Sequence, residues 1–133
     1  MYYVRVACSE DLSVIKEIAD ANKEEIGFIL RAIFEASIKS DEVFVACKDT
    51  NVVGFVRWHR RRDGWSTVYE ICVRRDFRRE GAARLLLRHV PKPIRLKCPE
   101  DNASNTFYEH LGSAFVGKER GKKKVLNIWT LVC

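Results

Sequence analysis

The sequence predicts an α+β fold in which helices flank a mixed, mostly antiparallel β-sheet. Two observations carry this prediction. Apolar residues recur at helical spacing in some segments and alternate with polar residues in others, and turn-forming residues separate three consecutive strand patterns. The expected order is β-α-α-β-β-β-α-β-α-β-β, with one strand-helix-strand crossover in the second half. At 133 residues, we expect a single domain over residues 1–133.

The first half of the chain starts with an alternating strand pattern at residues 2–7. Ser9 is a candidate N-cap for a helix that continues to residue 21. Apolar residues between 26 and 38 then recur at helical spacing and predict a second helix. The next three strands are expected at residues 43–48, 52–59 and 65–73, joined by Asp-Thr-Asn at 49–51 and by a tight turn at Asp63-Gly64.

The second half begins with a helix over residues 81–90, which ends because Pro91 and Pro93 cannot donate a backbone hydrogen bond. A short buried strand is expected at residues 94–98. Asp101 or Asn102 caps the next helix, and Gly112 suits the left-handed position that ends it. Val116 and residues 125–132 predict a final pair of strands around a basic turn.

Composition limits the class of protein. Hydrophobic residues make up 47% of the chain and charged residues 32%, as in a folded globular protein. No apolar run approaches the roughly 20 residues that cross a bilayer, so we expect no membrane partner. The five cysteines are odd in number and never form Cys-x-x-Cys, which argues against disulfides and against a metal site and predicts reduced thiols in the cytoplasm. The net charge of +6 favours an anionic partner.

A strand, a tight loop and a helix start follow one another at residues 67–83. Gly81, Ala82 and Ala83 would let a ligand approach the backbone at the beginning of the helix. The free amides and the positive end of the helix dipole favour a phosphate there, and Arg78 and Arg79 add positive charge. The same small residues also suit close packing of a helix on a sheet.

This segment resembles the acetyl-coenzyme A motif of GNAT-type N-acetyltransferases, Gln/Arg-x-x-Gly-x-Gly/Ala, at Arg78, Gly81 and Ala83. Residues 103–112 resemble the second motif of the family, Ala-x-x-Phe-Tyr-Glu-x-Leu-Gly-Phe, with one more residue between Ala103 and Phe107 and with Ser113 in place of the final Phe. The two motifs occur in the expected order and at the expected spacing. The resemblance implies a GNAT fold and an enzyme that moves acetyl from acetyl-coenzyme A directly to a primary amine, without a metal.

The resemblance also implies which residues bind the coenzyme. Asn105 would hydrogen-bond the pantetheine or the thioester end. An acidic side chain at Glu80 would weaken binding of a diphosphate unless it points to solvent. The backbone of a splayed strand would bind the pantetheine and the acetyl carbonyl, at Ile71, Cys72 and Val73. The pyrophosphate would lie on the amides that follow Arg78, namely Arg79, Glu80, Gly81, Ala82, Ala83 and Arg84.

Attack of an amine on a thioester needs a polarised carbonyl, a neutral amine and a protonated leaving group. A backbone N–H near Val73 could polarise the carbonyl. The motif places Tyr108 as the acid that protonates the thiolate, and Glu70 could accept the proton of the amine directly or through water. Packing alone would also explain Tyr108, and exposure to solvent would explain Glu70. Cys72 has no histidine partner in the pattern and is expected to be a core residue rather than a nucleophile.

Basic residues cluster at 57–62, with aromatic residues among them, and at 118–124. Solvated hairpin tips explain both clusters, and contact with the acceptor or the coenzyme 3′-phosphate is an alternative. The acceptor could be a peptide amine, a lysine side chain, a polyamine or another small amine. A function from another class also stays open, a non-catalytic basic module that binds RNA or DNA on the same fold. We expect nucleic-acid binding to be weak and non-specific at most, and a monomer or homodimer.

Overall fold

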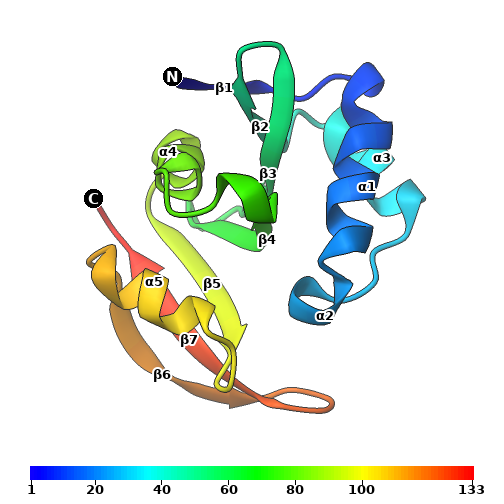
Figure 1. The fold of residues 1–133 in the computed structure, drawn as a ribbon. Coiled ribbons are helices and arrows are strands. Elements are labelled where there is room, and N and C mark those ends of the chain that lie inside the picture. The colour runs from blue at the N-terminus through cyan, green and yellow to red at the C-terminus, as the bar shows by residue number, and fades with distance from the viewer. The chain divides into compact units, whose positions relative to one another are not determined.

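The computed structural model describes the whole chain, from Met1 to Cys133. It contains seven strands, five α-helices and two short 3-10 turns, η1 and η2 (Figure 1). In chain order they are β1 (Tyr2–Val6), η1 (Ser9–Asp11), α1 (Leu12–Ala21), α2 (Lys23–Ile26), α3 (Arg31–Lys39), β2 (Val43–Lys48), β3 (Asn51–Arg60), β4 (Ser66–Val73), η2 (Arg75–Phe77), α4 (Ala82–His89), β5 (Ile94–Pro99), α5 (Ser104–His110), β6 (Ala114–Arg120) and β7 (Val125–Leu131).

The strands form one sheet in the order β1-β2-β3-β4-β5-β7-β6. β1 with β2, β2 with β3, β5 with β7, and β6 with β7 are antiparallel. β4 and β5 are parallel, from Ser66 opposite Ile94 to Val68 opposite Leu96. This topology confirms the predicted α+β fold with a mixed, mostly antiparallel sheet. No helix is both long enough and apolar enough to span a membrane.

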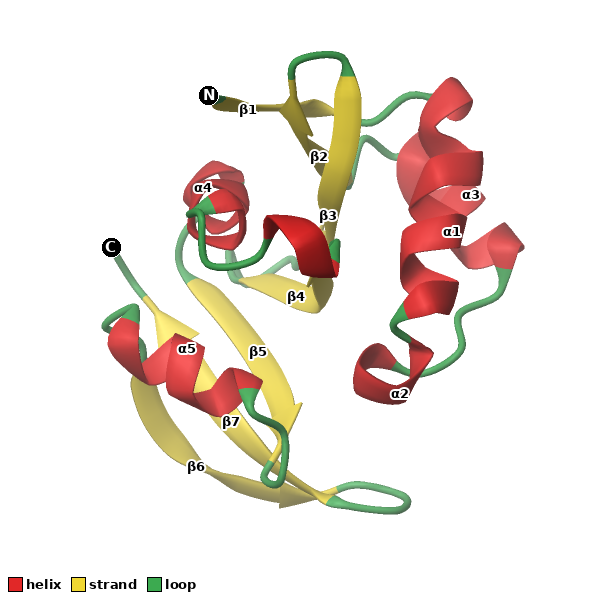
Figure 2. Cartoon of the chain, in the orientation of Figure 1, coloured by secondary structure: helices red, strands yellow, loops and turns green.

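The chain divides into two compact units, Met1–Trp58 with Glu70–Val90 and His59–Tyr69 with Pro91–Cys133. In the first unit, helices cover both faces of the strands (Figures 1 and 2). Phe44 of β2 faces α4, where its ring lies 6.0 Å from the ring of His89. Its neighbours Val43 and Val45 belong to the apolar cluster that α1 and α3 also line. The period of two along β2 therefore places α4 on one face and α1 with α3 on the other.

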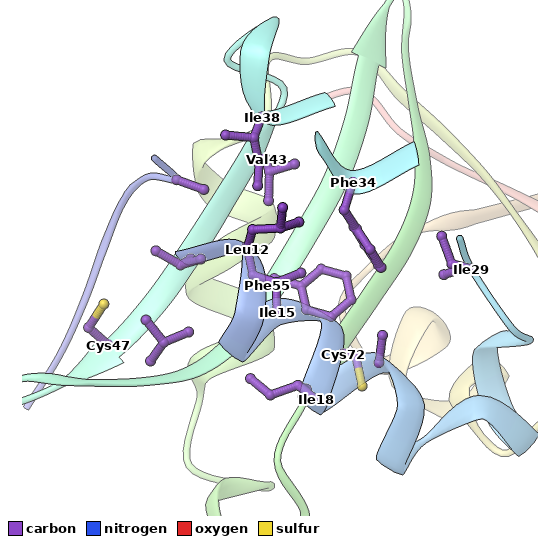
Figure 3. Packing of buried hydrophobic residues seen from close by; sticks show 14 residues of the cluster. Leu12, Ile15, Ile18, Ile29, Phe34, Ile38, Val43, Cys47, Phe55 and Cys72 are labelled. Atoms are coloured by element: carbon purple, nitrogen blue, oxygen red, sulfur yellow. The ribbon is translucent and has the colours of Figure 1, made fainter. Parts of the chain in front are cut away.

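The core under α1 and α3 consists of closely packed apolar side chains (Figure 3). Ile15, Phe34 and Phe55 are fully buried, and the two phenylalanine rings meet edge to face at 5.3 Å between centroids. Burying each such side chain stabilises the fold by about 1.5–3 kcal/mol. Cys72 of β4 belongs to the same cluster, so the core also fixes the C-terminal end of that strand.

Gly54 of β3 lies where the backbone of β4 approaches closely. A Cβ atom at this position would lie 2.8 Å from the carbonyl oxygen of Cys72 and 3.0 Å from a methyl group of Val73. The backbone amide of Arg74 donates to the carbonyl of Val53 at 2.8 Å, directly beside this contact. Only glycine leaves room for the end of β4 to lie this close to β3.

The second unit has its own smaller core, formed where α5 packs on the sheet (Figure 2). Trp129 of β7 is at its centre, with ring centroids 6.3 Å from Tyr108 of α5 and 5.6 Å from Phe115 of β6. Leu96 of β5 is buried opposite Trp129 in the antiparallel register. The contact between Tyr108 and Trp129 holds α5 against β7.

The start of the first helix differs from the prediction. Ser9 does not cap α1, because residues 9–11 form the 3-10 turn η1. The carboxylate of Asp11 accepts the backbone amide of Cys8 at 2.8 Å and both terminal nitrogens of Arg5 at 2.7 and 2.9 Å. Asp11 thus accepts the backbone amide that precedes η1, and the same carboxylate forms an ion pair with Arg5 of β1.

The second apolar stripe is divided between two helices. Gly27, with φ +83°, ends α2, and α3 begins only at Arg31. Phe34 and Ile38 enter the core as predicted, whereas Leu30 and Ile33 are exposed. The stripe failed as a continuous helix because a left-handed glycine interrupts it.

All five cysteines are free thiols, as the sequence predicts. Cys47, Cys72 and Cys98 are buried, whereas Cys8 and Cys133 are exposed. Burial raises the pKa of Cys72 and of Cys98 to about 11, so both stay protonated at neutral pH. These properties agree with core positions.

Replacing Gly54 with alanine tests the close approach of β3 and β4. We expect Gly54→Ala to lower the free energy of unfolding by ~1–3 kcal/mol, because the new methyl group collides with backbone atoms. Gly112→Ala is the comparison, since its left-handed φ costs about 1 kcal/mol but no atom lies within 4 Å of the new Cβ. Urea unfolding of both variants measures the difference. A Gly54→Ala protein as stable as the parent would show that the strands can move apart.

Candidate coenzyme-binding and catalytic site

The loop between β4 and α4 presents a row of backbone amides. Arg79, at φ +66°, and Gly81, at φ +91°, are both left-handed, and α4 starts directly after them. No group in the structure accepts a hydrogen bond from the amides of residues 79–84. No atom lies within 4 Å of where a Cβ of Gly81 would be, so the backbone there is open. Successive unpaired amides at a helix start are a binding site for phosphate.

The charges around this loop also suit an anion. The side chains of Arg79 and Arg84 form no ion pair. The carboxylate of Glu80 is held by β1 and β2: it accepts the hydroxyl proton of Tyr2 and lies 3.7 Å from the ammonium of Lys48. The hydrogen bond from Tyr2 holds the pKa of Glu80 below its usual range. The carboxylate of Glu80 is therefore directed toward the hydroxyl of Tyr2 and the ammonium of Lys48.

Arg78 has a different environment from the other arginines of the loop. Its Nε donates to the carbonyl of Val73 at 2.9 Å, and one terminal nitrogen donates to Asn22 Oδ1 at 2.8 Å. Both terminal nitrogens also lie 3.3 Å from the carboxylate of Glu25. The guanidinium thus points into the protein.

Ile71, Cys72 and Val73 form the end of β4, immediately before the loop. Cys72 and Val73 are buried, and Ile71 is half-buried. The side chain of Cys72 is packed in the apolar cluster, so Cys72 can contact a ligand only through its main chain. The role expected for these residues is a main-chain role, and it stays a prediction.

Glu70 is held by an arginine that the sequence analysis did not select. Its two carboxylate oxygens accept Arg57 Nε at 2.6 Å and a terminal nitrogen at 2.8 Å. The side chains are 11% and 15% exposed, so the pair is mostly shielded from water. A bidentate contact of this kind fixes the direction of the carboxylate.

The side-chain amide of Asn105 forms all its hydrogen bonds with other groups of the protein. Its Nδ2 donates to the carbonyls of Pro99 and Asn102 at 2.8 and 2.9 Å. Its Oδ1 accepts Trp129 Nε1 at 2.8 Å and Asn127 Nδ2 at 3.1 Å. Asn105 joins the loop before α5 to β7. The predicted contact with the pantetheine would have to compete with these bonds, and it stays a prediction.

Tyr108 lies in α5, and its side chain is 6% exposed. Its ring packs on Phe107 and Trp129, but its hydroxyl forms no hydrogen bond in the structure. Burial, with a smaller effect of the nearby Cys98, raises the pKa of Tyr108 far above its usual range. The phenol therefore stays protonated at neutral pH, and no protein group uses its proton.

The two basic turns lie at opposite ends of the second unit. Because Ser66 pairs with Ile94, the turn at residues 61–65 is near the start of β5. Because Pro99 pairs with Leu126, the turn at residues 121–124 is near its end. Lys118 and Lys124 also form ion pairs with Glu100 and Asp101. The turns at residues 61–65 and 121–124 are hairpin tips, whereas residues 57–60 of the first basic cluster lie in β3 and residues 118–120 of the second lie in β6. The two turns do not form one continuous basic surface.

The structure gathers the predicted residues in two groups. Residues 70–73 and 78–84 belong to the first unit, and Asn105 and Tyr108 to the second. The sequence analysis missed Arg57, Asn22, Glu25, Tyr2 and Lys48, which hold Glu70, Arg78 and Glu80. Each lies 13 or more residues from its partner in the sequence, so no local pattern could have indicated them. No group of three or more histidine, cysteine, aspartate or glutamate residues is arranged to hold a metal ion.

Comparison with known proteins agrees with this geometry. The family model described as an acetyltransferase (GNAT) domain matches residues 39–112, more than half of the chain. The matched segment contains β2 to β5 and α5, including the loop of unpaired amides and Tyr108. Comparison with curated protein sequences gives no match.

Several solved structures share the fold over almost the whole chain. A GNAT-family acetyltransferase from Bacillus cereus is 21% identical, with a TM-score of 0.82 and coverage of 99% of this chain and 97% of that one. The ribosomal-protein-S18-alanine N-acetyltransferase of Escherichia coli is 19% identical, with a TM-score of 0.82 and coverage of 99% and 94%. Arabidopsis thaliana Naa50, solved with the bisubstrate analogue CoA-Ac-MVNAL, is 14% identical, with a TM-score of 0.79 and coverage of 99% and 98%. At these identities, the similarity establishes the fold.

Proposed function

We propose that the chain, which belongs to the GNAT acetyltransferase family, transfers acetyl from acetyl-coenzyme A to a primary amine. The observation that carries this proposal is the row of unpaired amides at residues 79–84, at the start of α4. In a single GNAT domain over residues 1–133, this row would bind the coenzyme pyrophosphate. Arg79 and Arg84 would add charge, and the main chain of Ile71, Cys72 and Val73 would bind the pantetheine arm and the acetyl carbonyl.

The coenzyme would supply an acetyl thioester, whose carbon the amine attacks. Tyr108 then donates its phenolic proton to the departing sulfur. Three properties support this role: the phenol is buried, its hydroxyl has no partner in the protein, and its raised pKa keeps the proton in place at neutral pH. A residue that was needed only for packing could equally be phenylalanine.

Glu70 accepts the proton that the amine loses. Since Arg57 holds both carboxylate oxygens, we place a water molecule between the carboxylate and the amine. Each carboxylate oxygen retains a second lone pair for this water. Arg57 keeps the carboxylate correctly directed.

A peptide α-amine is the acceptor that we propose first. The E. coli neighbour is an alanine N-acetyltransferase of a ribosomal protein, and the Naa50 structure contains an acetylated peptide joined to coenzyme A. Lysine side chains and polyamines are the alternatives to test. The separate basic turns, with Lys118 and Lys124 in ion pairs, give no support to a nucleic-acid-binding function.

A charge at the start of α4 tests coenzyme binding. Ala83 is half-buried at the second position of α4, where aspartate is favourable for helix stability. We expect Ala83→Asp to raise the Kd for coenzyme A about 10-fold or more, because the carboxylate repels the pyrophosphate. Ala83→Asn, which has nearly the same size but no charge, is the control. Calorimetry measures both, and no binding of coenzyme A by the parent protein at millimolar concentration would refute the proposed function.

Removing one hydroxyl tests the acid. Tyr108→Phe keeps the aromatic packing on Trp129, so we expect the fold and the Kd for coenzyme A to change little. Turnover should fall by roughly 10²–10⁴-fold, because the thiolate leaves without a proton donor. Tyr3→Phe, at an exposed strand position, is the control and should retain full turnover. Equal turnover in the parent protein and in Tyr108→Phe would show that water, and not Tyr108, protonates the departing thiolate.

The pH dependence of Glu70→Gln tests the base. At pH 7, we expect kcat/KM to fall about 10–100-fold, because the amide cannot accept a proton. The loss should shrink as the pH approaches the pKa of the amine, about 8 for a peptide α-amine, where more of the acceptor is already neutral. Arg57→Gln breaks the same ion pair but keeps the carboxylate, so it is the matched control. A loss of equal size in both variants at every pH would identify a structural role for Glu70.

A further inference from the structure

Arg78 uses its whole guanidinium group within the protein. Nε and both terminal nitrogens are engaged with Val73, Asn22 and Glu25, at distances of 2.8–3.3 Å. Binding a phosphate through this side chain would require these contacts to break. The neighbouring Arg79 and Arg84 form no ion pair. Arg79 and Arg84 are therefore available to bind a ligand, whereas Arg78 is engaged within the protein.

The partners of Arg78 come from three different parts of the first unit. Val73 is the last residue of β4, and its carbonyl is fixed by Arg78 Nε. Asn22 follows α1, is only 4% exposed, and donates its own Nδ2 to the carbonyl of Ile18 at 2.8 Å. Glu25 lies in α2 and is also 3.9 Å from Arg75. Arg78 thus joins the end of β4 and the loop to the C-terminal end of α1 and to α2.

We propose that Arg78 is a positioning residue, which fixes the direction of the loop and of the end of β4 and does not bind the coenzyme phosphates. This inference rests on the proposed function for its catalytic consequence. Arg78 is well suited to the task because its planar fork can bind a carbonyl, an amide oxygen and a carboxylate at the same time, which a lysine ammonium cannot do with the same geometry. Two of the three acceptors are also shielded, since Asn22 and Val73 are buried, whereas Glu25 is partly exposed.

Two consequences distinguish positioning from phosphate binding. If Arg78 positions the loop, removing its partner Asn22 should have the same effect as removing Arg78, although Asn22 contributes no charge. If Arg78 binds phosphate, only the arginine should matter, and the effect should appear in the Kd for the coenzyme. Arg79→Gln is the matched control, because it removes an adjacent positive charge that has no ion-pair partner.

The first experiment uses the protein without ligand. Amide hydrogen exchange is measured by NMR at Arg74 and Phe77, whose amides donate to Val53 and Arg74 at 2.8 and 2.9 Å. We expect roughly 10-fold faster exchange in Arg78→Gln and in Asn22→Ala, and no change in Arg79→Gln. If Asn22→Ala does not fold, Glu25→Gln replaces it, because Glu25 is partly exposed. Unchanged exchange in Arg78→Gln would overturn the proposal, whether or not the protein proves to be an acetyltransferase.

The second experiment measures coenzyme A binding and turnover of the same variants. We expect kcat to fall about 10-fold in Arg78→Gln and in Asn22→Ala, with the double variant no worse than Arg78→Gln alone and with Kd values within about 3-fold of the parent. In Arg79→Gln, which removes a charge from the proposed phosphate site, the Kd should rise. A 10-fold or larger rise of Kd in Arg78→Gln without any effect of Asn22→Ala would overturn the proposal and make Arg78 a phosphate ligand. Failure of the parent protein to bind coenzyme A would instead refute the proposed function, and the exchange data would still decide the role of Arg78.

Discussion

A helix cannot satisfy the first amides of its own backbone, and the candidate site is arranged around this constraint. In α4, the problem is extended by the left-handed residues Arg79 and Gly81, which leave the amides of residues 79–84 without an acceptor. A core cannot contain such groups, so they must face a ligand or water. The contacts around the loop leave these amides open. The carboxylate of Glu80 is directed toward Tyr2 and Lys48, and the end of β4 is held beside the loop by its close approach to Gly54 and by Arg78.

In two ion pairs of the first unit, a residue near the candidate site is held by a residue from a different element. Glu70 is paired with Arg57 from the neighbouring strand, and Arg78 with Glu25 from α2. The Arg78–Glu25 pair is partly exposed, and pairs of this kind contribute little to stability, about 0–1 kcal/mol. Both ion pairs fix the orientation of the side chains, because a bidentate contact restricts the rotamers of both partners.

Local patterns in the sequence were sufficient for most of the fold and for the position of the loop. Periodicity identified the strands apart from β6, which was predicted from Val116 alone and runs from Ala114 to Arg120, and the small residues at 81–83 marked the start of α4. The errors have physical causes. Gly27 ends α2 because of its left-handed backbone, which apolar spacing does not reveal. Ser9 does not cap α1, because residues 9–11 form the turn η1, in which Asp11 accepts the amide of Cys8. The environments of Glu70, Arg78 and Asn105 were not predictable either, because their hydrogen bonds join segments that only the folded chain brings together.

The uneven burial of the five thiols has a practical consequence for spectroscopy. Cys47, Cys72 and Cys98 are enclosed in the fold, and for the latter two the pKa of about 11 leaves little reactive thiolate at neutral pH. Cys8 and Cys133 are exposed, and they lie in the first and the second unit respectively. Maleimide dyes or spin labels would therefore attach at one defined place in each unit of the unmodified sequence. Changing either exposed cysteine to serine would leave a single label, so that the unfolding of each unit could be followed by its own signal.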